Sequence, residues 1–110
     1  MPEFQLHPTL TADTIEIAQW PLCCVLLMND SRYPWLILVP ARVAMKEMHD
    51  LIAADQSLLM SEIDQASRIL SDLFTPDKIN VGGLGNIVQQ LHIHVLARFE
   101  SDDAWPGPVW

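Results

Sequence analysis

Two histidines one residue apart, His92 and His94, lie in an otherwise apolar run near the end of the 110-residue sequence. The run reads QQLHIHVLAR from Gln89 to Arg98 and predicts a β-strand. Side chains alternate between the two faces of a strand, so Gln90, His92 and His94 share one face at intervals of about 6.6 Å. Two imidazoles at that spacing can converge on one small group.

Three interpretations of the histidine pair stay open on these residues alone. In the first, both are partly exposed surface residues. In the second, they belong to a zinc or iron site, which requires a third ligand, although neither His7 nor His49 nor any carboxylate stands at an obvious spacing from the pair. In the third, one imidazole is a nucleophile toward phosphorus and the other is a hydrogen-bond donor.

A glycine-rich stretch, Gly82 to Asn86, precedes the histidines. The N–H groups of such a loop can line an anion. Alone, the loop is typical of an ordinary turn. Together with the histidine row it favours phosphate chemistry.

The charge of the chain limits the kind of phosphate ligand. The formal net charge is −8, from 14 acidic and 6 basic residues. General nucleic-acid binding depends on clustered lysine and arginine and is therefore not expected. A phosphate must be held locally, by backbone N–H groups and a few donors.

Secondary-structure patterns place these residues in a small α+β fold. Strands are predicted over 14–19, 23–28, 34–39, 78–81 and 89–99. A short helical turn is predicted around Met48, Leu51 and Ile52. The order of elements predicts a mostly antiparallel five-stranded sheet, with one long helix and one short helix packed on one face.

The long helix is predicted after Asp55, which has the residue type of an N-cap. Its apolar stripe comprises Leu59, Ile63, Ala66, Leu70 and Leu73, and Glu62, Asp64, Arg68 and Asp72 occupy the polar circumference. The sequence Thr75-Pro76-Asp77 ends the helix.

Length and composition predict a single domain over residues 1–110, since half of the residues are hydrophobic. The N-terminal stretch lacks the pattern of a secretion signal, and no apolar segment is long enough to cross a bilayer. The adjacent Cys23 and Cys24 would point to opposite faces of a strand, so a mutual disulfide is not expected. We therefore expect a cytoplasmic protein with no membrane partner.

The segment from Asn80 through Arg98 resembles the signature of the histidine-triad (HIT) nucleotide hydrolases and transferases. The family's run is His-φ-His-φ-His-φ-φ, where φ is apolar, often followed by arginine. Here the run begins at Gln90 instead of histidine and ends at Leu96. The resemblance also covers the element order over nearly the whole chain, and implies a HIT-like fold and a homodimer.

The resemblance implies a role for each triad position. His92 would attack the α-phosphorus of a nucleotide and become nucleotidylated, and His94 would contact the phosphate. The family's first triad residue serves the nucleophile through its main-chain carbonyl, which Gln90 also supplies. Implied substrate-binding residues are Asn29, with Asp30 as the less favoured neighbour for the ribose hydroxyls, and Asn80, Gly85, Asn86, Ile87 and Arg98.

The function implied is hydrolysis of a nucleoside phosphoanhydride or phosphoramidate, such as a diadenosine polyphosphate or an adenosine phosphoramidate, through a nucleotidyl-histidine. This route needs no metal held by the protein, although Mg²⁺ from solution can accompany a polyphosphate. The alternative is a nucleotide-binding or sensing module with little or no turnover, because Gln90 and Ile87 depart from the family pattern.

Two aromatic features stay open. Trp35 lies either in the core or along the nucleotide pocket. The segment Ala104–Trp110, with two tryptophans among prolines, packs either against a partner subunit or back on the chain's own core.

Overall fold

The computed structural model describes residues 3–110. Met1 and Pro2, which belong to the predicted domain 1–110 and to its N-terminal stretch, lie outside the described residues. In chain order the elements are α1 (Pro8–Asp13), β1 (Thr14–Gln19), β2 (Cys23–Met28), β3 (Trp35–Pro40), the 3₁₀-helix η1 (Met48–Asp50), α2 (Ala53–Phe74), β4 (Lys78–Gly82) and β5 (Ile93–Arg98).

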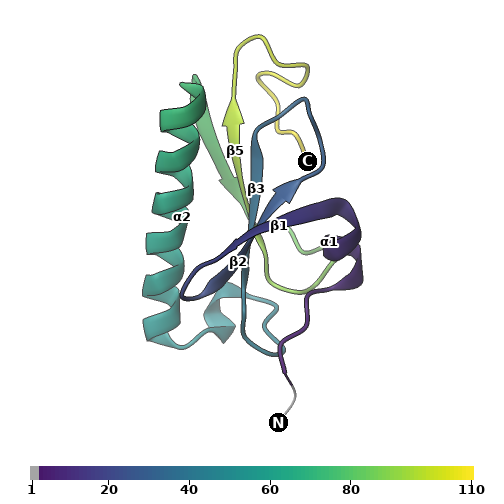
Figure 1. Ribbon diagram of the computed structural model, residues 1–110, viewed down its shortest axis with the longest axis vertical. Helices are drawn as coiled ribbons and strands as arrows, with labels where there is room; N and C mark the ends of the chain where they lie inside the picture. Colours follow the sequence, from purple (N-terminus) through teal and green to yellow (C-terminus); the bar gives the residue numbers. More distant parts are fainter. Residues whose placement is uncertain (1–2) are drawn as a thin grey trace.

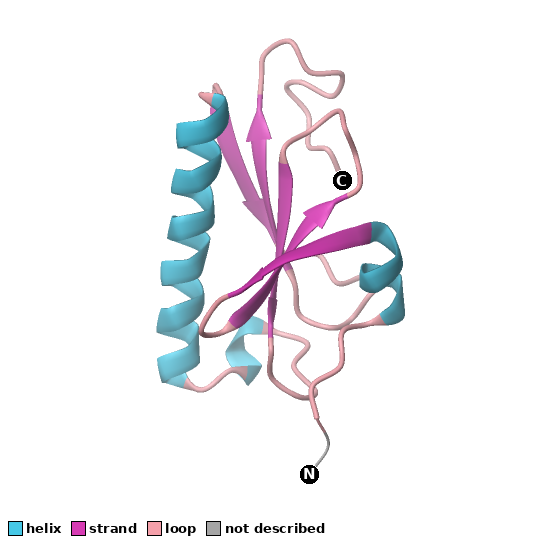
Figure 2. Cartoon of the chain, in the orientation of Figure 1, coloured by secondary structure: helices cyan, strands magenta, loops and turns pink. Residues whose placement is uncertain are grey.

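The strands form one antiparallel five-stranded sheet in the order β1-β2-β3-β5-β4. Helix α2 covers one face of the sheet, where it contacts β5 and β3. Helix α1 and the segment after β5 lie on the other side (Figure 1). Figure 2 shows the twisted sheet between these two layers. The arrangement confirms the predicted α+β fold.

Hydrophobic side chains form two core layers, one on each face of the sheet. Between the sheet and α2 lie Leu22, Cys23, Val25, Leu36, Leu38, Leu59, Ala66, Leu70, Ile93, Val95 and Ala97. On the opposite face lie Leu10, Cys24, Leu26, Tyr33, Trp35, Ile37, Val39 and Leu96. Strands β2, β3 and β5 contribute to both layers, which explains why their sequences are apolar without alternation.

The predicted strand limits are correct to within one residue for the first four strands. The last strand, predicted over 89–99, spans only Ile93–Arg98. The residues just before it bond elsewhere: the backbone N–H of Leu91 donates to the carbonyl of Met45. The histidine row therefore begins in a loop and enters the sheet only at its second histidine.

The predicted short helical turn is present as η1, and α2 ends at Phe74, before Thr75. Helix α1 was not predicted, because six residues are too few to show a helical period. It begins at Pro8, whose fixed φ suits the first helical position. The Nδ1 of His7 caps this helix by accepting from the N–H of Thr9.

The polar face predicted for α2 is wrong at Glu62. This residue is only 2 % exposed, and its two carboxylate oxygens accept from the backbone N–H groups of Leu22 and Cys23, at 2.9 and 2.8 Å. It lies three residues after Leu59 and four before Ala66, on the buried face. Glu62 thus connects α2 to the start of β2 through two hydrogen bonds.

Two further predictions for α2 are wrong, namely its N-cap residue and one member of its apolar stripe. Helix α2 begins at Ala53 with Ile52 as its N-cap. Asp55 lies inside the first turn, buried, where it pairs with Arg42 at 2.8 Å. Leu73, predicted as part of the apolar stripe, is 70 % exposed.

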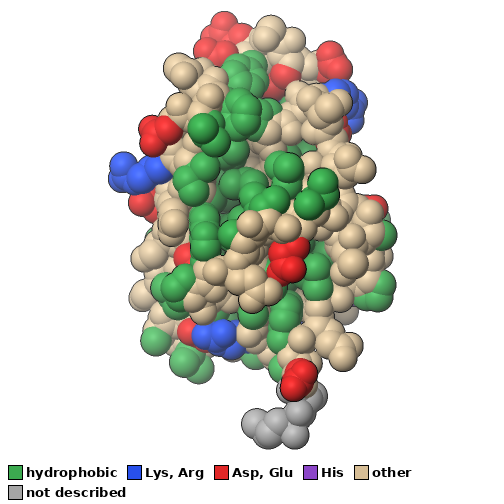
Figure 3. Space-filling view, in the orientation of Figure 1, with side chains coloured by type: hydrophobic (Ala, Val, Ile, Leu, Met, Phe, Trp, Pro, Cys, Tyr) green, Lys and Arg blue, Asp and Glu red, His purple; other side chains and the backbone are tan. Residues whose placement is uncertain are grey.

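On the side of the sheet that faces α2, β1 and the end of β2 remain partly exposed. Ile15 and Ile17 of β1 and Leu27 of β2 are exposed there, as are Leu73 and Phe74 at the end of α2. Figure 3 shows hydrophobic side chains gathered in a band between the upper half of α2 and β1. Among residues 3–110, no helix is long and apolar enough to span a membrane.

We predict that Glu62→Gln lowers the free energy of unfolding by about 2 kcal/mol, because the new NH₂ group opposes a buried backbone N–H that needs an acceptor. Urea unfolding followed by circular dichroism measures the change. Asp72→Asn, at an exposed position of the same helix, is the control and should change stability by less than about 0.5 kcal/mol. Equal stability of the two variants would contradict the role given to Glu62.

Candidate functional site

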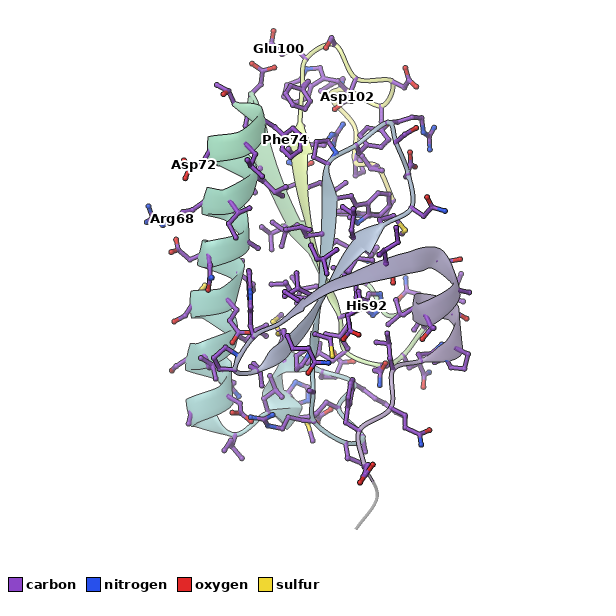
Figure 4. All side chains as sticks on the ribbon, in the orientation of Figure 1. Arg68, Asp72, Phe74, His92, Glu100 and Asp102 are labelled. Atoms are coloured by element: carbon purple, nitrogen blue, oxygen red, sulfur yellow. The ribbon has the colours of Figure 1, made fainter. Side chains whose placement is uncertain are left out.

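His92 and His94 lie on the face of the sheet opposite α2. His94 belongs to β5, where it pairs with Ile37 of β3 and Gly82 of β4. His92 comes just before the strand, and Figure 4 shows it on the side away from α2. Each residue is only 7 % exposed, and their ring centroids are 5.0 Å apart. They are therefore not surface residues.

A main-chain carbonyl fixes the tautomer of His92. Its Nδ1 lies 2.6 Å from the carbonyl oxygen of Gln90. A carbonyl oxygen can only accept, so Nδ1 carries the proton and donates. The lone pair of the neutral ring is then on Nε2, which is the nitrogen available for nucleophilic attack.

Trp35 fixes the opposite tautomer of His94. The indole Nε1–H of Trp35 donates to Nδ1 of His94 at 3.0 Å. An indole nitrogen can only donate, so the proton of the neutral ring is on Nε2. Burial lowers the pKa of His94 to about 4, with a smaller contribution from the neighbouring His92. At neutral pH His94 is an uncharged donor through Nε2.

The side chain of Gln90 is bonded to the N-terminal segment. Its Oε1 accepts from the backbone N–H of His7 at 2.8 Å, and its Nε2 donates to the carbonyl of Gln5 at 2.9 Å. Gln90 thus makes two kinds of hydrogen bond. Its main-chain carbonyl accepts from His92, and its side-chain amide binds the segment before α1. The second role could not be predicted, because the partners are more than eighty residues away.

The glycine loop forms one wall of a small cavity beside His92. The cavity has a volume of about 50 Å³, and its lining includes Lys46, Gly83, Gly85 and His92. Gly85 has a φ of 70°, a conformation that favours glycine. Lys46 and Glu47, which line the same cavity as His92, were not predicted, since single charged residues in a loop carry no sequence signal.

The predicted loop residues Asn86 and Ile87 follow the cavity lining and are exposed. Ile87 is 93 % exposed. Both side chains are open to solvent, and their predicted contacts with a phosphate stay predictions.

Asn29 and Asp30 line a second cavity, of about 350 Å³, between the end of α1 and the β2–β3 turn. Asn29 is exposed, and Asp30 pairs with Arg32 at 2.8 Å. Trp35 lines the same cavity while bonding to His94. Trp35 is therefore both a core residue and a link between this cavity and the histidines.

Arg98 is not placed for direct contact with a substrate, whereas Asn80 is half-buried and its binding role stays a prediction. Arg98 is 1 % exposed, and its guanidinium donates to both carboxylate oxygens of Asp102, to Oδ1 of Asn80 and to the carbonyl of Gly107. This contact holds the pKa of Asp102 well below its usual range. The predicted binding role is replaced by a structural one: Arg98 anchors the segment after β5. Asp102 was not predicted, because only the turn after β5 brings its carboxylate back to the guanidinium of Arg98.

That segment folds back on the chain's own sheet. Trp105 lies against Arg98, with 5.8 Å from the guanidinium to the ring centroid. The ring of Trp110 lies beside His94, at a centroid distance of 5.5 Å. In the single chain this segment therefore packs on the protein's own sheet, while Trp110 remains 39 % exposed, and packing of the tryptophans against a partner subunit stays a prediction.

The described residues 3–110 contain no group of three histidine, cysteine, aspartate or glutamate side chains arranged to hold a metal ion. Chemically, the arrangement offers Nε2 of His92, with Nδ1 held by a carbonyl, and the Nε2–H of His94, next to the cavity of the glycine loop.

Comparisons with known proteins agree with this geometry. A family model described as HIT domain matches residues 10–101. Among solved structures, a histidine triad protein from Bradyrhizobium japonicum is 48% identical, with a TM-score of 0.97 over 99% of this chain and 81% of that chain. A histidine triad protein from Sinorhizobium meliloti 1021 is 50% identical, with a TM-score of 0.96 over 97% and 79%. One from Marinobacter aquaeolei VT8 is 47% identical, with a TM-score of 0.97 over 99% and 80%.

A HIT family protein from Bacillus anthracis shares only 17% identity at a TM-score of 0.69, and this likeness concerns the fold alone. Comparison with curated proteins gives no match. The match over most of the sequence and the identity to the three histidine triad proteins agree: the chain belongs to the HIT domain family.

Proposed function

We propose that this protein is a nucleotide hydrolase that cleaves a nucleoside phosphoanhydride or phosphoramidate through a nucleotidyl intermediate on His92. HIT proteins are in general nucleotide hydrolases or transferases. The observation that carries the proposal is the pair of opposite tautomers, since one ring presents a lone pair and its neighbour presents a donor. Diadenosine polyphosphates and adenosine phosphoramidates are the proposed substrate class.

In the first step, Nε2 of His92 attacks the α-phosphorus. The new N–P bond forms as the bond from phosphorus to the leaving oxygen or nitrogen breaks, and the leaving group takes a proton from solvent. The ring becomes a cation that still carries its Nδ1 proton, and the carbonyl of Gln90 stabilises that cation through the 2.6 Å contact. Gln90 thus acts as the first triad residue through its main chain.

In the second step, water attacks the phosphorus and gives up a proton to solvent, the N–P bond breaks with its electron pair returning to Nε2 of His92, and the nucleoside monophosphate leaves. Throughout, His94 would donate from Nε2 to a non-bridging oxygen, and the N–H groups near Gly85 would donate to the same phosphate. Preorganised donors of this kind are usually the largest single contribution to catalysis. Lys46 and Glu47, of opposite charge, both line the cavity beside His92, so the proposed phosphate binding relies on these hydrogen-bond donors and not on a positive field.

The nucleoside would occupy the cavity lined by Asn29, Asp30 and Trp35, with its ribose hydroxyls on Asn29. The site as proposed requires no metal held by the protein. Mg²⁺ would enter only with a polyphosphate substrate.

A second candidate function is nucleotide binding with little or no turnover. The exposed side chain of Ile87 favours it, because an isoleucine side chain offers the phosphate no hydrogen bond. Incubation with labelled nucleotide phosphoramidates and dinucleoside polyphosphates separates the two functions, since only the enzyme releases nucleoside monophosphate.

Homodimer formation and a cytoplasmic location stay predictions. The exposed apolar residues of β1, β2 and α2 are compatible with a partner surface, and sedimentation velocity tests the dimer.

We predict that His92→Ala abolishes turnover but leaves nucleotide affinity within about threefold, because the change removes the nucleophile and leaves the cavities intact. Steady-state kinetics and equilibrium binding measure the two effects. Mass spectrometry of quenched reactions should find the nucleotidyl adduct on the wild-type chain and not on the variant.

His49→Ala is the matched control, because the side chain of His49 is 82% exposed. It should turn over at the wild-type rate. Turnover by His92→Ala within tenfold of the wild type would exclude the covalent mechanism.

Excess chelator is expected to leave phosphoramidate turnover unchanged, since every proposed group in the reaction comes from the protein or water. The measurement compares rates with and without EDTA, then after zinc addition. Loss of activity with recovery on zinc would identify the histidine pair as a ligand set instead.

Gln90→Ala is predicted to keep kcat within about tenfold, because alanine retains the carbonyl that orients His92. Unfolding stability should fall by about 1–2 kcal/mol, since two hydrogen bonds to the N-terminal segment are lost. Gln89→Ala, at the exposed neighbouring position, should change neither quantity. A hundredfold loss of kcat in folded Gln90→Ala would show that the amide itself takes part in the reaction.

A further inference from the structure

Trp110 lies against the proposed phosphate donor. Its ring centroid is 5.5 Å from that of His94, and the two planes are inclined by 34°. On its other sides His94 meets Trp35, through the indole hydrogen bond, and the edge of His92. The imidazole of His94 therefore has three aromatic neighbours, and Trp110 is the one that comes from the segment after β5.

Gly82 provides the space that Trp110 occupies. Gly82 is the residue of β4 that pairs with His94. A Cβ atom at this position would lie 2.7 Å from Cζ2 and 3.1 Å from Cη2 of the Trp110 ring. Glycine within a strand often marks a close approach by another group. Here the approaching group is the indole, so any larger residue at this position would displace it.

The hydrogen bonds of Arg98 hold the segment that carries Trp110 near Gly82 and His94. Arg98 joins β5 to Asp102 and to the carbonyl of Gly107, and Asn80 joins the same guanidinium to β4. The segment that follows Gly107 therefore starts from a fixed point above the β4–β5 pair. Val109, the residue before Trp110, lines the Asn29 cavity. The last two residues thus border both the nucleoside cavity and the donor histidine.

We propose that Trp110, seated on Gly82, is a positioning residue for His94 in the proposed nucleotidyl transfer to His92. The inference rests on the proposed function and deepens it. The indole restricts the tilt of the imidazole and excludes water from its face. His94 then keeps its neutral form, with Nδ1 accepting from Trp35 and Nε2 free to donate to the phosphate.

The electrostatic surroundings of His94 make this exclusion of water measurable. The neighbours on β3, β4 and the segment after β5 are Trp35, Gly82 and Trp110, and none has a charged side chain. His92 is the titratable neighbour. Because burial is the main cause of the lowered pKa of His94, removing the indole should raise that pKa from about 4 toward the ordinary histidine value.

The test is a double-mutant cycle with Gly82→Ala and Trp110→Ala, with Trp110→Phe as the conservative variant. Two quantities are measured on each purified full chain: kcat/KM for a nucleotide phosphoramidate, and the pKa of His94 from its ring proton resonances in an NMR titration. Leu73→Ala, which removes an apolar side chain that is 70 % exposed on α2, is the control.

We expect Trp110→Ala and Gly82→Ala each to lower kcat/KM by about tenfold or more, since a misplaced donor loses much of its effect. The double variant should be no worse than either single variant, because both act through the same indole. Trp110→Phe should recover most of the activity. The pKa of His94 should rise in Trp110→Ala and in Gly82→Ala, and Leu73→Ala should match the wild type in both measurements.

Additive effects of the two substitutions, or an unchanged His94 pKa in Trp110→Ala, would overturn the proposal. The titration needs no turnover. If the wild-type chain hydrolyses no nucleotide, the proposed function fails. A raised His94 pKa in Trp110→Ala and Gly82→Ala would still show that the indole of Trp110 packs over Gly82 and shields His94.

Discussion

Every residue of β5 from Ile93 to Arg98 is buried, so this strand must satisfy two environments at once. Ile93, Val95 and Ala97 fill the layer under α2, while His94 and Arg98 face the other side. A shift of the strand by one residue would place the histidine in the hydrophobic layer and an aliphatic side chain in the site. The packing of the α2 layer therefore sets the position of the donor imidazole.

The buried polar groups follow one rule, since each has a specific partner. Glu62 accepts from two backbone N–H groups, Arg98 is surrounded by acceptors, and His94 accepts from an indole. An unpaired group at any of these positions would be strongly destabilising. The rule also explains why Arg98 is unsuited to a ligand: its donors are already occupied inside the protein. His92 and His94 each use Nδ1 in a hydrogen bond within the protein, which leaves Nε2 of both rings for a ligand.

Local patterns predicted the strands, the long helix and the common face of the two histidines, because strand alternation and helical period are encoded by neighbours in the sequence. The residues that define the detailed site have partners far away in the chain. Gln90 contacts residues more than eighty positions earlier, and Glu62 contacts a turn about forty positions earlier. No local pattern distinguishes such a glutamine or glutamate from an exposed one. The same reason hid Trp35 as a partner of His94, 59 positions away. Asp102 is only four residues after Arg98, but it reaches the guanidinium through a turn that no strand or helix period predicts.

The place of β5 in the sheet has a consequence for how the molecule reaches its folded state. Although β5 is the last strand in the sequence, it lies inside the sheet, between β3 and β4. During synthesis, β1, β2, β3 and α2 leave the ribosome before the strand that must join β4 to them. Until β5 inserts, β3 has an unpaired edge and α2 lacks the strand with which it makes its largest set of contacts. Closure of the sheet and assembly of the two histidines are thus the same late event, which depends on contacts between distant parts of the chain.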